Sequence, residues 1–120
     1  MLRSLLKSKI HRVVVTEANL DYEGSLTIDG DLMQAAEILP FEQIHIWDVT
    51  NGSRITTYAI EGERGSGIIC VNGAGAHLVQ KGHIIIIATF GQYQPQELHD
   101  YHPVIILVNE NNRIKEKRTH

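Results

Sequence analysis

Short apolar runs of strand length recur along this chain of 120 residues, and turn residues separate them. Runs of about four to eight β-branched or aromatic residues bounded by Gly, Pro, Asn or Asp are typical of β-strands. Asn51-Gly52, between two such runs, is a strong signal for a hairpin. We therefore expect strands at 13–15, 25–28, 44–49, 54–60, 68–71, 83–90 and 104–108. Many short strands with one or two short helices predict a mainly β fold, a small closed barrel without exposed strand edges.

Helical signals are few. The apolar spacing within residues 2–10 leaves open a short helix in place of an N-terminal strand. Asp29 or Asp31 could cap a second helix that continues to Leu39 and stops before Pro40. Residues 110–120 are mostly polar and predict a solvated tail, partly helical.

Length and charge limit the classes of protein that the chain can belong to. One domain spanning 1–120 fits this length. Eleven basic and fourteen acidic residues give a net charge of -3, which argues against nucleic-acid binding. No apolar run approaches the roughly 20 residues that a membrane helix needs. Cys70 is the single cysteine, so an internal disulfide is excluded and a cytoplasmic location is expected.

The expected strand at 54–60 carries polar side chains on both faces. Because strand side chains alternate, Arg54, Thr56 and Tyr58 share one face, and Thr57 lies on the other. A guanidinium and a phenol on one face could meet the same small ligand.

Three other patterns suggest chemistry, and each has a simpler explanation. The two histidines in 99–102 have metal-like spacing, but no second pair of ligands stands out, so we expect no metal site. Cys70 with His77 could form a thiol nucleophile, but a cysteine inside an apolar strand is usually a small buried side chain. The small residues in 73–76 lack the rest of a phosphate-loop motif and predict a turn whose N–H groups can still bind an anion.

Several short motifs, in this order, resemble one known family along the length of the chain. They are Lys9-Ile10-His11-Arg12, Tyr22-Glu23-Gly24-Ser25, Ile46-Trp47-Asp48-Val49-Thr50-Asn51-Gly52, Arg54, Thr57-Tyr58-Ala59-Ile60, Glu63-Arg64-Gly65-Ser66 and Val71-Asn72-Gly73-Ala74. The family is the pyruvoyl-dependent aspartate 1-decarboxylases. Two departures are Gly75, where alanine is more usual, and the tail after Val108, which matches no part of the family pattern.

The resemblance implies a double-psi β-barrel, a homotetramer and decarboxylation of L-aspartate to β-alanine, which feeds pantothenate and coenzyme A synthesis in the bacterial cytoplasm. It also implies that the chain cuts itself between Gly24 and Ser25 into pieces 1–24 and 25–120, with Ser25 becoming the pyruvoyl group that forms a Schiff base with the substrate. Thr57 would assist the cut, and whether a maturation-promoting protein is needed stays open.

The family pattern also assigns binding roles. Tyr58 would return a proton to the substrate Cα, and Arg54 and Lys9 would hold carboxylates. The remaining residues expected to bind substrate or line the site are Thr57, Asn72, Gly73, Ala74, Gly75, His11, Tyr22 and Trp47. Because Thr57 and Tyr58 lie on opposite faces, both can serve one site only if the strand bends or subunits share it. The alternatives are a non-catalytic double-psi barrel that binds a ligand and a pyruvoyl decarboxylase of another amino acid.

Overall fold

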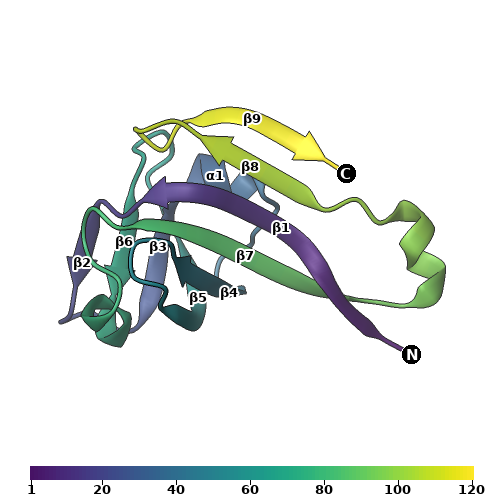
Figure 1. Cartoon of the computed structure of the whole chain (residues 1–120), viewed down its shortest axis with the longest axis horizontal. Helices are drawn as coiled ribbons and strands as arrows, with labels where there is room; N and C mark the ends of the chain where they lie inside the picture. The colour runs from purple at the N-terminus through teal and green to yellow at the C-terminus, as the bar shows by residue number, and fades with distance from the viewer.

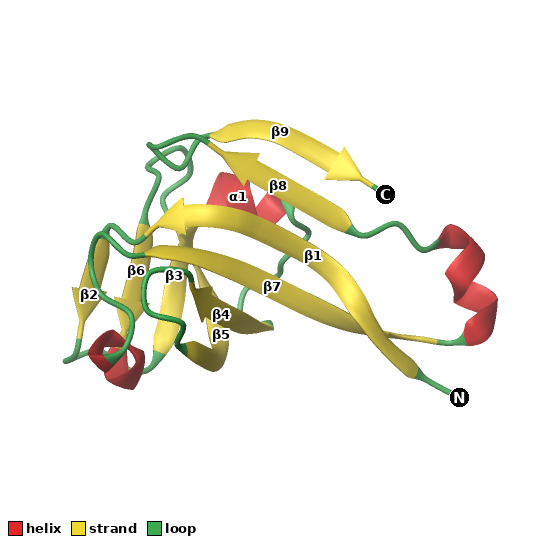
Figure 2. Ribbon diagram, viewed as in Figure 1, coloured by secondary structure: helices red, strands yellow, loops and turns green.

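A computed structural model describes all residues, 1–120, and half of the chain lies in β-strands. The strands are β1 (Arg3–Val14), β2 (Glu17–Asn19), β3 (Ser25–Asp29), β4 (Gln43–Asp48), β5 (Arg54–Gly62), β6 (Ile69–Asn72), β7 (Ile84–Tyr93), β8 (Val104–Val108) and β9 (Ile114–Thr119). One α-helix, α1 (Gly30–Ala35), and two 3-10 helices, η1 (Gly73–His77) and η2 (Pro95–Asp100), complete the fold (Figures 1 and 2). The predicted mainly β class is confirmed.

The strands form one continuous ladder in the order β2-β6-β3-β5-β4-β7-β1-β8-β9. β5 is central to this arrangement because it changes partner along its length. Its first half pairs antiparallel with β4, up to Tyr58, and its second half pairs parallel with β3 from Ala59 onward. Hydrogen bonds do not join β2 to β9, so closure into a double-psi barrel stays a prediction.

The hydrophobic core lies between the two parts of this folded sheet. Every strand except β2 and β9 contributes to a cluster of 20 buried residues, in which Ile10, Leu26, Ile46 and Ile87 are fully buried. Burying a side chain of this size contributes about 1.5–3 kcal/mol. The alternation predicted for residues 44–49 is confirmed: Ile44, Ile46 and Asp48 are buried, and the residues between them are not.

The N-terminal segment is a strand, so the helical alternative for residues 2–10 is wrong. β1 pairs with β7 along its length and with β8 on its other side. A bulge falls between Ile10 and Val13, where Arg12 has a φ of 64°. Pairing on both edges satisfies the backbone of β1, which a short isolated helix could not match.

The predicted helix ending at Leu39 is too long. Asp29 caps α1 by accepting a hydrogen bond from the Asp31 N–H at 2.8 Å. The helix closes at Glu37, whose φ is 58°, with Ile38 N–H donating to Met33 O at 2.9 Å. This is a Schellman closure with glutamate where glycine is usual, so the sequence signal at Pro40 placed the end of the helix too late. Leu39 lies beyond it and is exposed.

The C-terminal segment is solvent-exposed but not helical. β9 pairs antiparallel with β8, and all its residues are exposed. The turn before it is anchored by Asn112, which is 2% exposed. Its amide accepts from Val14 N–H and donates to the carbonyls of Val14 and Gly67, each at 2.8 Å. This buried side chain explains why a polar segment is held against the sheet.

Candidate active site

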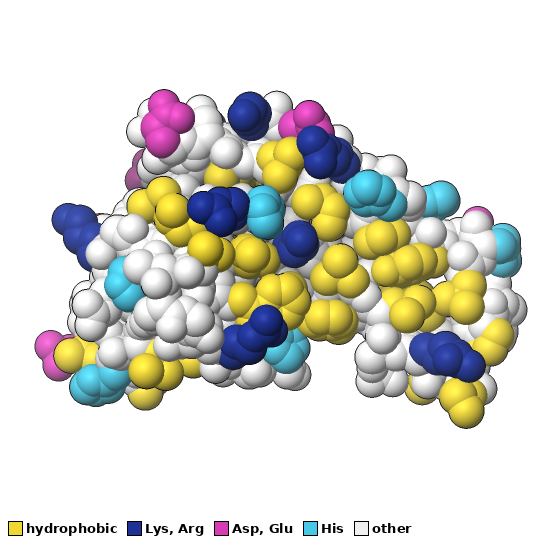
Figure 3. Space-filling view, viewed as in Figure 1, with side chains coloured by type: hydrophobic (Ala, Val, Ile, Leu, Met, Phe, Trp, Pro, Cys, Tyr) yellow, Lys and Arg dark blue, Asp and Glu magenta, His cyan; other side chains and the backbone are white.

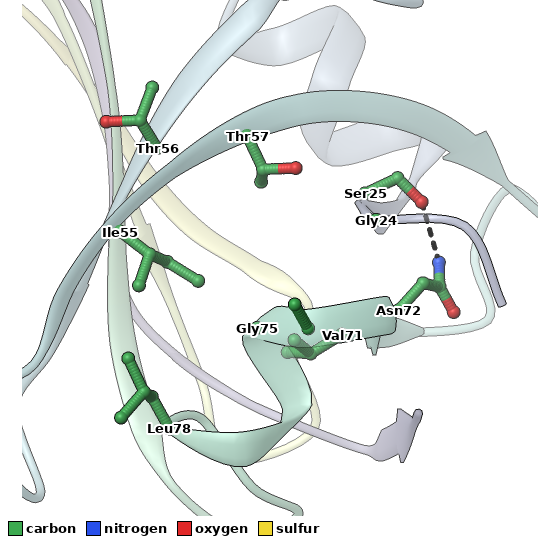
Figure 4. A pocket seen from close by; sticks show the side chains of 10 residues that line it. Gly24, Ser25, Ile55, Thr56, Thr57, Val71, Asn72, Gly75 and Leu78 are labelled. Atoms are coloured by element: carbon green, nitrogen blue, oxygen red, sulfur yellow. Dashed lines mark hydrogen bonds between the residues drawn. The ribbon is translucent and has the colours of Figure 1, made fainter. Parts of the chain in front are cut away.

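Ser25 is the first residue of β3 and lies beside the point where β5 changes partner. The register pairs Leu26 with Ala59, which places Ser25 next to Tyr58. On its other side Ser25 pairs with Asn72 of β6. Ser25 is 3% exposed, and Asn72 Nδ2 donates to its Oγ at 3.0 Å (Figure 4). A serine at the start of a buried strand is therefore held by a side chain from the neighbouring strand.

Two cavities meet at Ser25 and Asn72. The first, of about 330 Å³, is lined by Gly24, Ser25, Ile55, Thr56, Thr57, Val71, Asn72, Ala74, Gly75 and Leu78. The second, of about 600 Å³, is lined by Asp21, Tyr22, Glu23, Ser25, Thr27, Tyr58, Ile60, Ile68, Cys70 and Asn72. Both volumes fall within the range of small-molecule sites, about 300–1,000 Å³.

The predicted opposition of Thr57 and Tyr58 is present in the structure. Thr57 lines the first cavity, and Figure 4 shows its hydroxyl pointing toward Gly24 and Ser25. Tyr58 lines the second cavity and lies against Phe41, with ring centroids 6.2 Å apart. Because Ser25 borders both cavities, the two side chains can act on the same residue from opposite sides without a bend in β5.

Gly73 fits closely against the Gly24-Ser25 junction. Its φ is +75°, and a Cβ built there would lie 2.7 Å from both the Cα and the N of Gly24. Only glycine adopts this backbone geometry without cost and allows such a close approach. A Cβ at Gly24 itself would meet nothing within 4 Å, and Gly24 has no positive φ. The glycine that the backbone geometry of this junction requires is therefore Gly73 and not Gly24.

Gly75 widens the first cavity. A Cβ at this position would lie 2.9 Å from Ile55 Cδ1 and 3.3 Å from Val71 Cγ1. The first contact is with the end of a flexible side chain, so an alanine here would require only a rotation of Ile55. Ala74 lines the same cavity at the start of η1. The turn predicted at residues 73–76 is the 3-10 helix η1, which follows Asn72, and its role in binding stays a prediction.

Four side chains predicted for the site line neither cavity within the single chain: Lys9, His11, Trp47 and Arg54. Arg54 stacks over Trp47, with its guanidinium carbon 4.9 Å from the ring centroid, and both line a separate cavity of about 190 Å³. Lys9 is on β1, separated from β3 by β7, β4 and β5. The structure thus does not bring Arg54 and Tyr58 to one ligand in one chain.

His11 occupies the bulge of β1. Burial, followed by the positive charges of Lys9 and Arg12, lowers the pKa of its imidazole below 6.5. Its Nδ1 is buried without a hydrogen-bond partner. Its surroundings therefore favour the neutral form of the imidazole.

Other motifs considered from the sequence have ordinary structural roles. His99 pairs with its neighbour Asp100 at 3.2 Å, whereas His102 Nδ1 donates to the carbonyl of His120. Cys70 is a buried free cysteine. No helix is long and apolar enough to cross a bilayer.

Sequence reasoning missed Thr27 and the side-chain contacts of Cys70. Asn72 Nδ2 donates to Thr27 Oγ1 at 3.1 Å, and Cys70 Sγ donates to Asn72 Oδ1 at 3.3 Å. The alternation of side chains along each strand carried a signal, because Thr27 follows Ser25 by two residues and Cys70 precedes Asn72 by two. The signal can be interpreted only once β3 is known to pair with β6, and these two strands are far apart in sequence.

Comparisons with known proteins give a consistent result. A sequence model of the family described as aspartate decarboxylase matches residues 1–115. Aspartate 1-decarboxylase of Syntrophomonas wolfei is 56% identical over 116 residues, which cover 97% of this chain and 98% of the relative. The proteins of the same name from Albidiferax ferrireducens and Myxococcus xanthus are 53% and 51% identical, covering 100% and 95% of this chain and 89% and 88% of the relatives.

Proposed function

The chain belongs to the aspartate decarboxylase family, and we propose that it removes the α-carboxyl group of L-aspartate, giving β-alanine and carbon dioxide, with a pyruvoyl group made from its own Ser25. The observation that carries this proposal is the Gly24-Ser25 junction, where a buried serine held by Asn72 meets the Thr57 cavity.

The proposed cleavage proceeds in three balanced steps. Ser25 Oγ attacks the Gly24 carbonyl carbon, the peptide C–N bond breaks, and the released nitrogen takes the hydroxyl proton, which leaves an ester. Ser25 Cα then loses a proton and the Cβ–Oγ bond breaks, so that Oγ leaves as an oxygen of the Gly24 carboxylate and dehydroalanine remains. Water finally replaces the nitrogen, releasing ammonia. Thr57, which lines the same cavity as Gly24, would hydrogen-bond the Gly24 carbonyl oxygen as charge develops on it.

The residues around Ser25 fit a pyruvoyl group. Gly73 has no side chain to obstruct the junction, and Asn72 offers an N–H to it. The group supplies an electron sink for the charge left on the substrate Cα when carbon dioxide departs. From the second cavity, Tyr58 would donate a proton to that carbon. The N–H groups of Ala74 and Gly75 in the first cavity, and of the adjacent Gly73, would bind a substrate carboxylate, and Tyr22 lines the second cavity.

Aspartate has two carboxylates, and the single chain places no cationic side chain in either cavity. Arg54 and Lys9 lie on the outer face of the sheet. Trp47 is the cross-strand partner of Arg54, and His11 follows Lys9 by two residues on β1. We therefore infer that these residues reach the substrate from a second copy of the chain, within a homotetramer.

The surface of the chain supports this assembly. Figure 3 shows hydrophobic side chains gathered over β1 and β7 toward η2. Among the residues of this region, Leu2, Phe90 and Leu98 are 53%, 43% and 38% exposed. Continuous apolar surface of this kind marks contact between proteins.

Carbon dioxide release from L-aspartate and intact-mass spectrometry test the proposal together. The wild-type chain should yield a piece ending at Gly24 and a piece 25–120 with a ketone in place of its N-terminal amine, while Ser25→Ala should stay whole and inactive. Activity in an uncut wild-type chain would refute the pyruvoyl mechanism. A cut chain that releases no carbon dioxide from L-aspartate would favour a decarboxylase of another amino acid. An uncut, inactive chain would favour a ligand-binding barrel.

Two further experiments test whether self-cleavage needs a helper protein and how many chains assemble. A purified chain that stays whole until a cell extract from the source bacterium is added, and then cuts itself, would identify a helper protein. Light scattering well above the 13.5 kDa of one chain would support the homotetramer. By family, the product serves pantothenate synthesis in the cytoplasm.

A further inference from the structure

Four polar side chains form a small group on the outer face of β3 and β6, which we call the amide clamp: Ser25, Thr27, Cys70 and Asn72. The register pairs Ser25 with Asn72 and Thr27 with Cys70. Cross-strand partners in an antiparallel pair lie on the same face. All four side chains therefore project together, and all four line the second cavity.

The carboxamide of Asn72 lies at the centre of the clamp and has a partner in each direction. Its Nδ2 donates to Ser25 Oγ at 3.0 Å and to Thr27 Oγ1 at 3.1 Å. Its Oδ1 accepts from Cys70 Sγ at 3.3 Å. Both amide hydrogens and the carbonyl are thus engaged by side chains, and the amide is 8% exposed, so water does not compete freely for it.

A carboxamide can occupy such a place in two orientations, related by a half-turn. In the orientation present, Ser25 Oγ faces an N–H donor; after a half-turn it would face a carbonyl oxygen. Burial, followed by the negative charge of Glu17, raises the pKa of the Cys70 thiol. The thiol therefore stays protonated and offers its hydrogen to Oδ1, while Thr27 Oγ1 accepts from the opposite side.

The orientation matters for the elimination step of the self-cleavage proposed above, on which this inference rests. When the Cβ–Oγ bond of Ser25 breaks, its electron pair stays on Oγ, which becomes part of the Gly24 carboxylate. An N–H at 3.0 Å from this atom stabilises the developing negative charge, and a carbonyl oxygen there would oppose it.

We propose that Thr27 and Cys70 are positioning residues for self-cleavage: they hold the Asn72 carboxamide with its N–H toward Ser25 Oγ, so that it stabilises Oγ as the leaving oxygen. Neither side chain touches a reacting atom in this scheme. Both act through Asn72.

The test compares variants that remove or keep each partner. Thr27→Val removes the acceptor at nearly constant volume, and Thr27→Ser keeps it. Cys70→Ala removes the donor, and Cys70→Ser keeps one. Time courses of intact mass give the rate at which the pyruvoyl piece forms, and hydroxylamine reports the ester because it releases 25–120 with Ser25 unaltered.

Thr27→Val and Cys70→Ala should each slow formation of the pyruvoyl piece by about 2- to 10-fold, the worth of one net hydrogen bond, and raise the fraction released by hydroxylamine. The two serine variants should cleave like wild type. In an Asn72→Ala background, Thr27→Val should cause no further slowing, because the group through which it acts is absent.

The positioning role would be wrong if Thr27→Val slowed cleavage equally with and without Asn72. It would also be wrong if Thr27→Ser and Cys70→Ser slowed cleavage as much as Thr27→Val and Cys70→Ala. Should Thr27→Val fail to fold, the Cys70→Ala and Cys70→Ser pair decides by the same criterion. A wild type that cleaves, with every variant at the wild-type rate, overturns this inference alone. A wild type that turns over aspartate without cleaving overturns the proposed function itself.

Discussion

Gly73→Ala is expected to obstruct self-cleavage by displacing the backbone that is cut. The added Cβ would lie 2.7 Å from the Cα and N of Gly24 and 2.9 Å from Tyr22 O. Ordinary van der Waals contact begins at 3.4 Å, so the segments must separate by about 0.7 Å, the difference between 3.4 and 2.7. Because all three contacted atoms belong to the backbone, no side-chain rotation can relieve the contact.

Two effects of this substitution can be separated. Alanine at a φ of +75° costs about 1–2 kcal/mol of stability through backbone strain alone. Displacing reacting atoms by about 1 Å can cost a further 10²-fold in rate. We therefore expect cleavage of Gly73→Ala to be about 10- to 100-fold slower than that of wild type.

Gly82→Ala is the matched control. Gly82 has a φ of +89°, and a Cβ there would meet nothing within 4 Å. It should show the strain without the contact: a similar loss of stability in thermal unfolding and a wild-type rate of cleavage by intact mass. If the two alanine variants cleave at the same rate, the close approach of Gly73 to Gly24 is irrelevant to processing and the reasoning is wrong.

Three further predictions concern the roles of single side chains. Tyr58→Phe should still cleave itself, and borohydride should still fix aspartate to its 25–120 piece, but carbon dioxide release should fall by about 10²–10⁴-fold because the proton donor is gone; normal turnover would reassign the donor. Arg54→Lys keeps the charge and loses the planar fork, so kcat/KM should fall by about one to two powers of ten, and an unchanged value would exclude a carboxylate role. His11 should make the fold less stable in acid: its pKa is lowered in the folded chain, so the unfolded chain binds more protons as pH falls through 6.5, and stability drops there. His11→Gln should weaken the dependence of Tm on pH between 7.5 and 5.5, and an unaltered dependence would contradict this.

Local pattern was sufficient for β3 to β8 and for the faces of β5, but it missed β2 and β9 and left the start of β1 open. Alternation placed Thr57 and Tyr58 on opposite sides, and Asn51-Gly52 placed the hairpin between β4 and β5. These features depend on neighbours in sequence, where side-chain direction follows from the two-residue period of a strand. The Gly24-Ser25 pair was found by family resemblance, since alone it is an ordinary turn. The roles given to Arg54, Lys9 and Tyr58 stay predictions.

Contacts between distant segments decided what local pattern could not. The change of partner along β5 puts Ser25 between two cavities, and the pairing of β3 with β6 assembles the amide clamp. The backbone hydrogen bond from Ile38 to Met33 closes α1, and the side chain of Asn112 fixes the C-terminal turn by hydrogen bonds to Val14 and Gly67. Gly73 is required because another segment lies 2.7 Å from its missing Cβ. In each case the free energy comes from a partner 30 or more residues away, or from a backbone geometry that its own residue type disfavours, so only the tertiary structure could reveal it.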